Sequence, residues 1–193
     1  MSILKKWAGC VMSFIAGVLG LALSATTGMK VVTEVVGNKI PDASKTVKAF
    51  KVITDSNLYD EAKLAGNGTE FVWLKIFAIL TLIISILLIV YSIISLLQNV
   101  NVIKSTHIAF DIVGWALVGL FLIATIGLLI SSNVYANVTE TSTIASVMNL
   151  LGVPKSVISC KASVGVYQPV MLVVSIITAI VTGVFSFLKK KDA

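Results

Sequence analysis

The apolar run from Ile76 to Leu97 constrains the fold of this chain more than any other feature. It has 22 residues without a charge, glycine or proline, and it reads IFAILTLIISILLIVYSIISLL. As an α-helix it would be roughly 33 Å long, enough to cross a hydrocarbon core of about 30 Å. Inside lipid, a single segment satisfies its own backbone hydrogen bonds only as a helix. The run therefore predicts a membrane-spanning helix.

Three further apolar segments predict three further spans. The chain is 57% hydrophobic and only 12% charged, about half the charged fraction of a soluble domain. We expect one domain over all 193 residues, an all-α membrane protein built as a four-transmembrane-helix bundle. The two outer loops should form a small extracellular cap. The expected spans are about 7–29, 71–97, 108–131 and 169–188, and the expected outer loops are 30–70 and 132–168.

Lysines near the ends of short segments predict the orientation. They lie at Lys5 and Lys6, at Lys104 in the hairpin between the second and third spans, and at 189–191. Such lysines mark cytoplasmic ends. We therefore expect cytoplasmic termini, large loops on the outer side, and insertion in the plasma membrane. All 15 basic residues are lysine, and the lack of arginine argues against a nucleic-acid partner.

Each large loop contains a predicted amphipathic helix. Asp42 to Ile53 places apolar side chains on one side and lysines on the other, and Thr141 to Leu151 has an apolar side before Gly152 stops it. Asn67 and Asn137 begin glycosylation patterns in these loops.

Small residues recur at helical spacing in the first and last spans. Such rows let helices approach closely in lipid, within one chain or between copies. Both alternatives stay open. The helix-packing residues we expect are Gly9, Ser13, Ala16, Gly17, Gly20, Ser24 and Gly28 in the first span, and Ser175, Ala179 and Gly183 in the last.

Two polar features are weaker candidates for function. His107 and Asp111 are four residues apart at the start of the third span and could relay protons or hold a cation. A purely structural role is the alternative, because a helix start favours a negative charge. Alongside the small row of the last span, a thin polar stripe could face a pore; it consists of Thr178, Thr182 and Ser186.

No catalytic motif, metal-ligand set or cofactor motif is found, so we expect no enzyme, no metal and no cofactor. Four spans, a large first outer loop, a tight inner hairpin and short ends resemble the tetraspan families. The claudin and peripheral-myelin type is nearest in proportions. The likeness is one of topology: residues 30–70 lack that family's Gly-Leu-Trp element and paired cysteines, and Cys160 stands without the tetraspanin Cys-Cys-Gly signature.

The leading functional hypothesis is a non-enzymatic structural or assembly subunit. Its partners would be membrane lipids and either further copies of the chain or other membrane subunits. The first alternative is an oligomeric pore or channel. The second is a proton- or cation-coupled carrier that uses Asp111.

Overall fold

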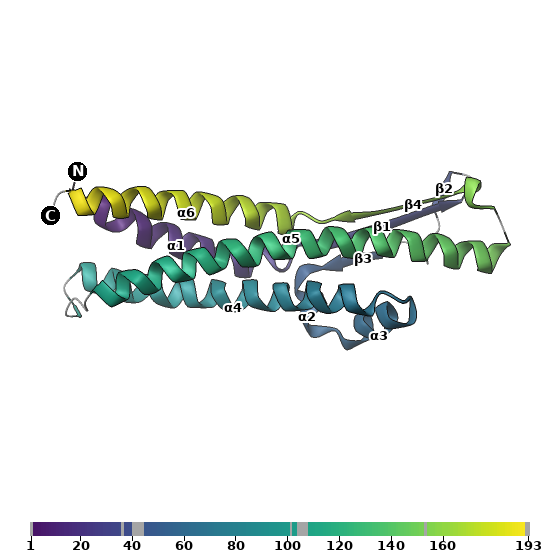
Figure 1. Ribbon diagram of the computed structural model, residues 1–193, viewed down its shortest axis with the longest axis horizontal. Helices are drawn as coiled ribbons and strands as arrows, with labels where there is room; N and C mark the ends of the chain where they lie inside the picture. The colour runs from purple at the N-terminus through teal and green to yellow at the C-terminus, as the bar shows by residue number, and fades with distance from the viewer. Residues whose placement is uncertain are drawn as a thin grey trace. The chain divides into compact units, whose positions relative to one another are not determined.

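A computed structural model describes residues 2–35, 37–39, 45–100, 102–103, 108–152 and 154–191; the side chains of 2–6, 39, 108, 109 and 185–191 lie outside the description. The described chain is mostly helical (Figure 1). The helices are α1 (Ser2–Leu23), α2 (Ala49–Thr54), α3 (Ser56–Leu64), α4 (Gly68–Asn99), α5 (Ile108–Leu151) and α6 (Tyr167–Lys191), with a 3₁₀ turn at Lys155–Val157. The strands are β1 (Thr27–Val35), β2 (Asn38–Lys39), β3 (Lys45–Lys48) and β4 (Ile158–Val164).

The chain forms two compact units. The bundle unit consists of Met1–Ala22, Leu80–Ile126 and Val170–Ala193. The sheet unit consists of Leu23–Ile79 and Gly127–Pro169.

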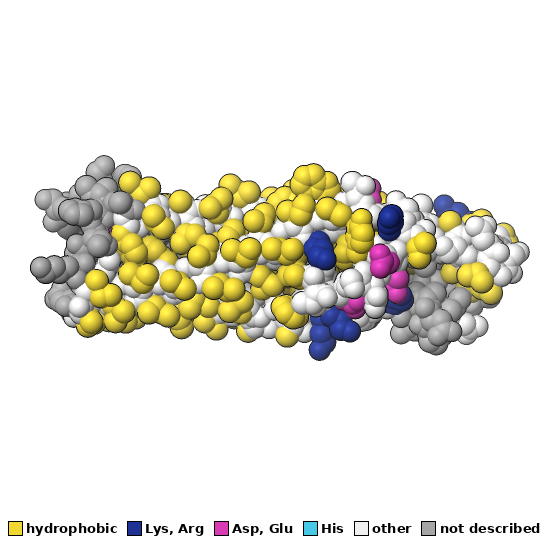
Figure 2. Space-filling model, turned by 90° about the horizontal axis from the view of Figure 1, so that it is seen from below, with side chains coloured by type: hydrophobic (Ala, Val, Ile, Leu, Met, Phe, Trp, Pro, Cys, Tyr) yellow, Lys and Arg dark blue, Asp and Glu magenta, His cyan; other side chains and the backbone are white. Residues whose placement is uncertain are grey.

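The bundle unit buries side chains of all sizes and exposes many large apolar ones. Ala16, Leu88, Phe121 and Met171 are fully buried, one from each of its four helical segments. Large side chains such as Phe14, Ile86 and Ile123 are exposed instead. Figure 2 shows hydrophobic side chains covering the visible face of these helices. A surface of exposed large apolar side chains suits contact with lipid.

Three described helical segments are long and apolar enough to cross a membrane, which indicates a membrane protein. They are Gly68–Asn99, Phe110–Leu151 and Tyr167–Val184. In α1, the described apolar part, Trp7–Leu23, is shorter. The helix of α1 ends at Leu23, six residues before the end that we predicted for the first span, and residues 27–35 continue as a strand.

The sheet unit contains a four-stranded sheet, which corrects the all-α prediction for the outer loops. Its central strand β1 pairs antiparallel with β2, β3 and β4. The pairing with β4 runs from Met29 opposite Val164 to Val35 opposite Ile158 (Figure 1). Burial alternates along β1, since Met29, Val31 and Thr33 are buried whereas Lys30 is exposed. Such alternation is typical of a half-buried strand.

The amphipathic helix predicted over Asp42 to Ile53 is wrong in its first half. Residues 42–44 lie outside the described part, and Lys45–Lys48 form β3 before α2 begins at Ala49. Val47 lies opposite Met29 in the sheet and is buried there, whereas the prediction placed it on the apolar face of a helix. A tertiary pairing therefore outweighed the local helical spacing.

The helix α5 is continuous over 44 residues. We predicted a span ending near Ser131 and a separate short helix from Thr141, whereas the structure joins them. The predicted stop is confirmed: α5 ends at Leu151, and Gly152 has φ +63° and donates its N–H to the Met148 carbonyl at 2.9 Å. This is an ordinary helix end at a left-handed glycine.

Candidate functional site

The small residues predicted on the first span divide between the two units. Ser13, Ala16, Gly17 and Gly20 are buried inside the bundle unit. A Cβ on Gly17 would lie 2.6 Å from the Ser85 carbonyl oxygen of α4, and one on Gly20 would collide with the Ser85 side chain. This part of the row therefore packs α1 against α4 within one chain. Gly9 differs, because no described atom beyond its own helical turns and chain neighbours lies within 4 Å of its Cβ position.

The last two members of that row lie in the sheet unit and outside any helix. The Ser24 carbonyl accepts the Phe50 N–H at 2.8 Å. Gly28 lies where the β1–β3 register shifts, and a Cβ there would come within 2.8 Å of the Ala49 Cα. Its carbonyl accepts the N–H of Gly165 at 2.9 Å and the side-chain amide of Gln168 at 2.8 Å. Gly28 therefore allows a close backbone approach rather than helix packing.

The predicted row on α6 is also internal to the bundle unit. Ser175 is fully buried, and its hydroxyl lies 2.8 Å from that of Thr125 on α5. Ala179 is half-buried. A Cβ on Gly183 would lie 3.3 Å from the Trp115 ring of α5. The row therefore joins α6 to α5.

The predicted pore stripe lies beside this row. Thr178 is fully buried and donates its hydroxyl to the Val174 carbonyl at 2.8 Å. The Thr182 hydroxyl is buried and makes no hydrogen bond within the described part of the chain. The side chain of Ser186 lies outside the described residues. The pore hypothesis stays a prediction.

The predicted proton or cation pair is only partly described. Asp111 is exposed in the first turn of α5, where a carboxylate interacts favourably with the helix dipole. His107 lies outside the described residues. Within the described ranges, no group of three or more His, Cys, Asp or Glu residues could hold a metal ion. The carrier hypothesis also stays a prediction.

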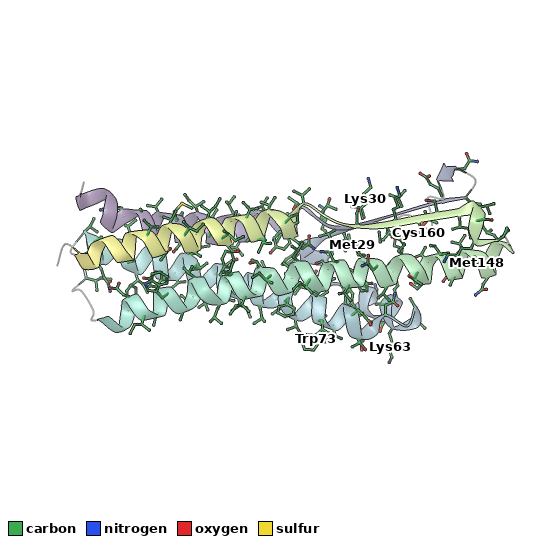
Figure 3. The ribbon with its side chains drawn as sticks, turned by 45° about the horizontal axis from the view of Figure 1, so that its top comes forward. Met29, Lys30, Lys63, Trp73, Met148 and Cys160 are labelled. Carbon is green, nitrogen blue, oxygen red and sulfur yellow. The ribbon has the colours of Figure 1, made fainter. Side chains whose placement is uncertain are left out.

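The structure brings together a different site, a cavity of about 300 Å³ inside the sheet unit. We call it the sheet cavity. The buried side chains of Met29, Val31 and Val47 form its floor on the sheet. Figure 3 labels Met29 beside Lys30, its exposed neighbour on β1. Helices form its sides, and they contribute Val52, Leu58, Glu61, Ala62, Phe71, Leu74, Tyr135, Thr139, Ser142, Thr143, Ser146, Val147 and Leu150, together with Ala65 and Asn67 from the turn between α3 and α4.

Aromatic packing fixes the inner wall of the sheet cavity. Phe71 and Tyr135 are almost fully buried, and their ring centroids lie 5.4 Å apart in an edge-to-face arrangement. Tyr59 of α3 adds a tilted contact with Phe71 at 6.3 Å. Edge-to-face pairs stabilise packing beyond the area they bury. The wall is therefore preformed.

One face of α5 lines the sheet cavity with hydroxyl groups. Thr139, Ser142 and Ser146 donate their hydroxyls to the carbonyls of Tyr135, Thr139 and Ser142, at 2.7, 3.1 and 2.9 Å. A hydroxyl that donates in this way keeps lone pairs that can accept. Asn67 uses one of them, because its side-chain amide donates to the Ser142 Oγ at 3.0 Å. The α5 face therefore presents mainly hydrogen-bond acceptors.

Charge in the lining of the sheet cavity is balanced. Its charged members are Lys45 and Glu61, and the Lys45 Nζ lies 2.7 Å from the Glu61 Oε2. Both side chains are 55% exposed, so this ion pair lies at the mouth of the cavity. Exposed pairs contribute little to stability, so its main effect is to leave the lining neutral.

The sequence does not predict the sheet cavity, because its lining comes from elements that lie far apart in the chain: β1, β3, and the helices α2 to α5. One local signal was present: Thr139, Ser142, Thr143 and Ser146 follow the helical spacing of a single face. No protein-family model matches the sequence, and the search of curated proteins finds no similar protein.

Proposed function

We propose that the protein is a non-enzymatic, four-span membrane protein that acts as a structural or assembly subunit, in a homo-oligomer or a larger membrane complex. The fourth span would be α1, whose described apolar part is the shortest of the four. Both termini would be cytoplasmic, and the sheet unit would be the extracellular cap at the plasma membrane. The lysine distribution supports this orientation.

A single observation carries the assembly role. Gly119 is exposed near the middle of the predicted third span, 108–131, between large apolar residues, and no described atom beyond its own helical turns and chain neighbours lies within 4 Å of its Cβ position. Glycine in a helix interior costs about 1 kcal/mol relative to alanine. At Gly20 the close approach of α4 offsets this cost. The described packing of the chain offers no such contact at Gly119. Ala116, one turn earlier, is also exposed.

A helix from a neighbouring subunit could approach closely at Gly119, which is how small residues promote association in lipid. Gly119 is therefore a better site for assembly than the buried row of α1. The small residues of α1 and α6 would then serve folding of the monomer.

The test is the particle mass of the purified protein in mild detergent, with co-purifying chains identified. We expect a multimer or a stoichiometric complex. Gly119→Leu should reduce the mass to that of the free monomer by filling the close-approach site. Ala22→Leu is the matched control, because Ala22 is an exposed small residue on α1, and its particle mass should stay unchanged.

A wild-type monomer without partners, or an unchanged particle mass in Gly119→Leu, would overturn the proposal. Gly20→Leu should behave differently from both variants. It would place a side chain against Ser85 and lower the thermal stability of the monomer itself.

A further inference from the structure

We propose that the sheet cavity binds an uncharged amphiphile from the surrounding membrane, with an apolar chain and a hydroxyl-bearing head. This inference is independent of assembly, since it concerns only the interior of the sheet unit. The sheet cavity has a volume of about 300 Å³, which is at the lower end of the range for small-molecule sites, about 300–1,000 Å³.

Shape and polarity of the lining decide the class of ligand. The floor and inner wall are apolar and aromatic, from Val31, Val47 and Phe71 among others. An apolar chain buried there would gain about 25 cal/mol per Å² removed from water. A polypeptide partner is less well suited, because the cavity is bounded by the sheet, α2, α3, α4 and α5 rather than extended along one edge.

The hydroxyl face of α5 decides the head group. Thr139 and Ser146 already donate to backbone carbonyls, so each offers an acceptor to a ligand. A ligand with hydroxyl donors complements these acceptors, whereas a carboxylate, which only accepts, does not.

Charge selects further against an anion. The Lys45 ammonium group at the mouth is already neutralised by Glu61 at 2.7 Å. A fatty acid or a phosphate would have to compete with Glu61 for it. An uncharged head, such as the glycerol of a monoacylglycerol, meets no such competition.

The membrane is a suitable source of this ligand. Phe71 and Leu74 line the cavity, and both fall at the start of the predicted second span, 71–97. Trp73, on the same turns of α4, is 55% exposed, as expected of an aromatic residue at a membrane–water interface (Figure 3). An amphiphile at the interface would therefore lie at the depth of these residues.

The experiment uses the full chain in lipid nanodiscs, with tritiated 1-monodecanoylglycerol supplied through the bilayer. Ser146→Trp places a bulky ring at the mouth and should weaken binding at least tenfold. Thr141→Trp is the matched control: Thr141 is exposed on the same helix, donates its hydroxyl to the Asn137 carbonyl in the same way, and does not line the cavity. It should bind like the wild type.

A second variant tests the head-group argument without blocking the cavity. Glu61→Gln leaves the Lys45 ammonium without its carboxylate. The ratio of monodecanoylglycerol to decanoate binding should then shift at least fivefold towards decanoate, at mildly alkaline pH where the acid is ionised. Because both residues are half-exposed, the fold should tolerate this change.

Two results would overturn the proposal. One is equal binding by Ser146→Trp and Thr141→Trp, which would show that the probe only partitions into the bilayer. The other is wild-type preference for decanoate over monodecanoylglycerol. Either result would leave the particle-mass test of assembly unaffected.

Discussion

Cys160 shows how the inner face of the sheet controls the chemistry of a single side chain. It is 4% exposed, and it lies opposite Thr33 of β1, whose hydroxyl donates to its sulfur at 3.5 Å (Figure 3). Burial is the main cause that raises the pKa of the Cys160 thiol. The nearby negative charge of Glu140 raises this pKa further, while the hydrogen bonds of Thr33 and Thr143 oppose the rise. The thiol should therefore stay protonated at neutral pH.

The prediction at residue scale concerns thiol reactivity. Both variants carry Cys10→Ala, so each has a single cysteine, either Cys160 itself or a cysteine at 159 in a Ser159→Cys, Cys160→Ala chain. Cys160 should react with a maleimide on the order of ten times more slowly than the cysteine at 159. The reason is that only the thiolate reacts, and burial keeps the Cys160 thiol protonated. Ser159 is the exposed neighbour on the same strand. Unfolding should make the two rates equal. Equal rates in the folded protein would contradict the burial of Cys160.

The raised pKa of Cys160 also makes the free energy of unfolding of the sheet unit depend on pH. The unfolded thiol has the lower pKa and loses its proton first as the pH rises. The contribution of the protonated Cys160 to the free energy of unfolding is therefore complete below the unfolded pKa and falls at higher pH. The alkaline loss of stability should be smaller in Cys160→Ala than in the wild type.

At the scale of elements, the pairing of β1 on both of its edges makes it the most constrained strand of the sheet. Backbone amides in a doubly paired strand open only when the sheet opens. We expect peptides covering β1 to exchange hydrogen more slowly than peptides covering α3, a nine-residue helix with mostly exposed side chains. Hydrogen exchange followed by mass spectrometry measures this. Fast exchange across residues 27–35 would argue against the sheet.

Elements with local signals could be predicted from the sequence. The run 71–97 falls inside α4, and Gly152 ends α5, because length, hydropathy and a left-handed glycine act locally. The sequence does not predict the sheet, because the apolar start of β1 continues the apolar pattern of the first predicted span. Its partner β4 lies far along the chain, and a pairing of that kind leaves no local pattern beyond alternation.

The candidate site was less predictable than the helices. The acceptor face of α5 has a visible spacing, but the floor of the cavity depends on Val47 lying opposite Met29, which only the sheet register establishes. The small-residue spacing of α1 is visible in the sequence, and in the structure Gly17 and Gly20 lie close to α4. Their partner, Ser85 of α4, could not be identified from spacing alone.

At the scale of the whole molecule, the orientation proposed from the lysines has a direct test. In a chain without Cys10 and Cys160, Leu64→Cys and Val102→Cys place single thiols at positions that are 90% and 70% exposed. We expect a membrane-impermeant maleimide to label Leu64→Cys on intact cells and Val102→Cys only after permeabilisation, because one predicted span separates them. The reverse pattern would invert the topology, and labelling of both on intact cells would remove the second span.

The β1–β4 pairing also determines when the sheet can form during synthesis of the chain. β1 lies at 27–35 and β4 at 158–164, so the ribosome completes β4 only after α5. At a translation rate of about 5–20 residues per second, one edge of β1 stays unpaired for on the order of ten seconds. A nascent chain that stops before β4 exposes that edge, and an exposed edge is a template for pairing with other chains. The sheet can therefore close only after the chain has been made through Val164, with α4 and α5 already complete.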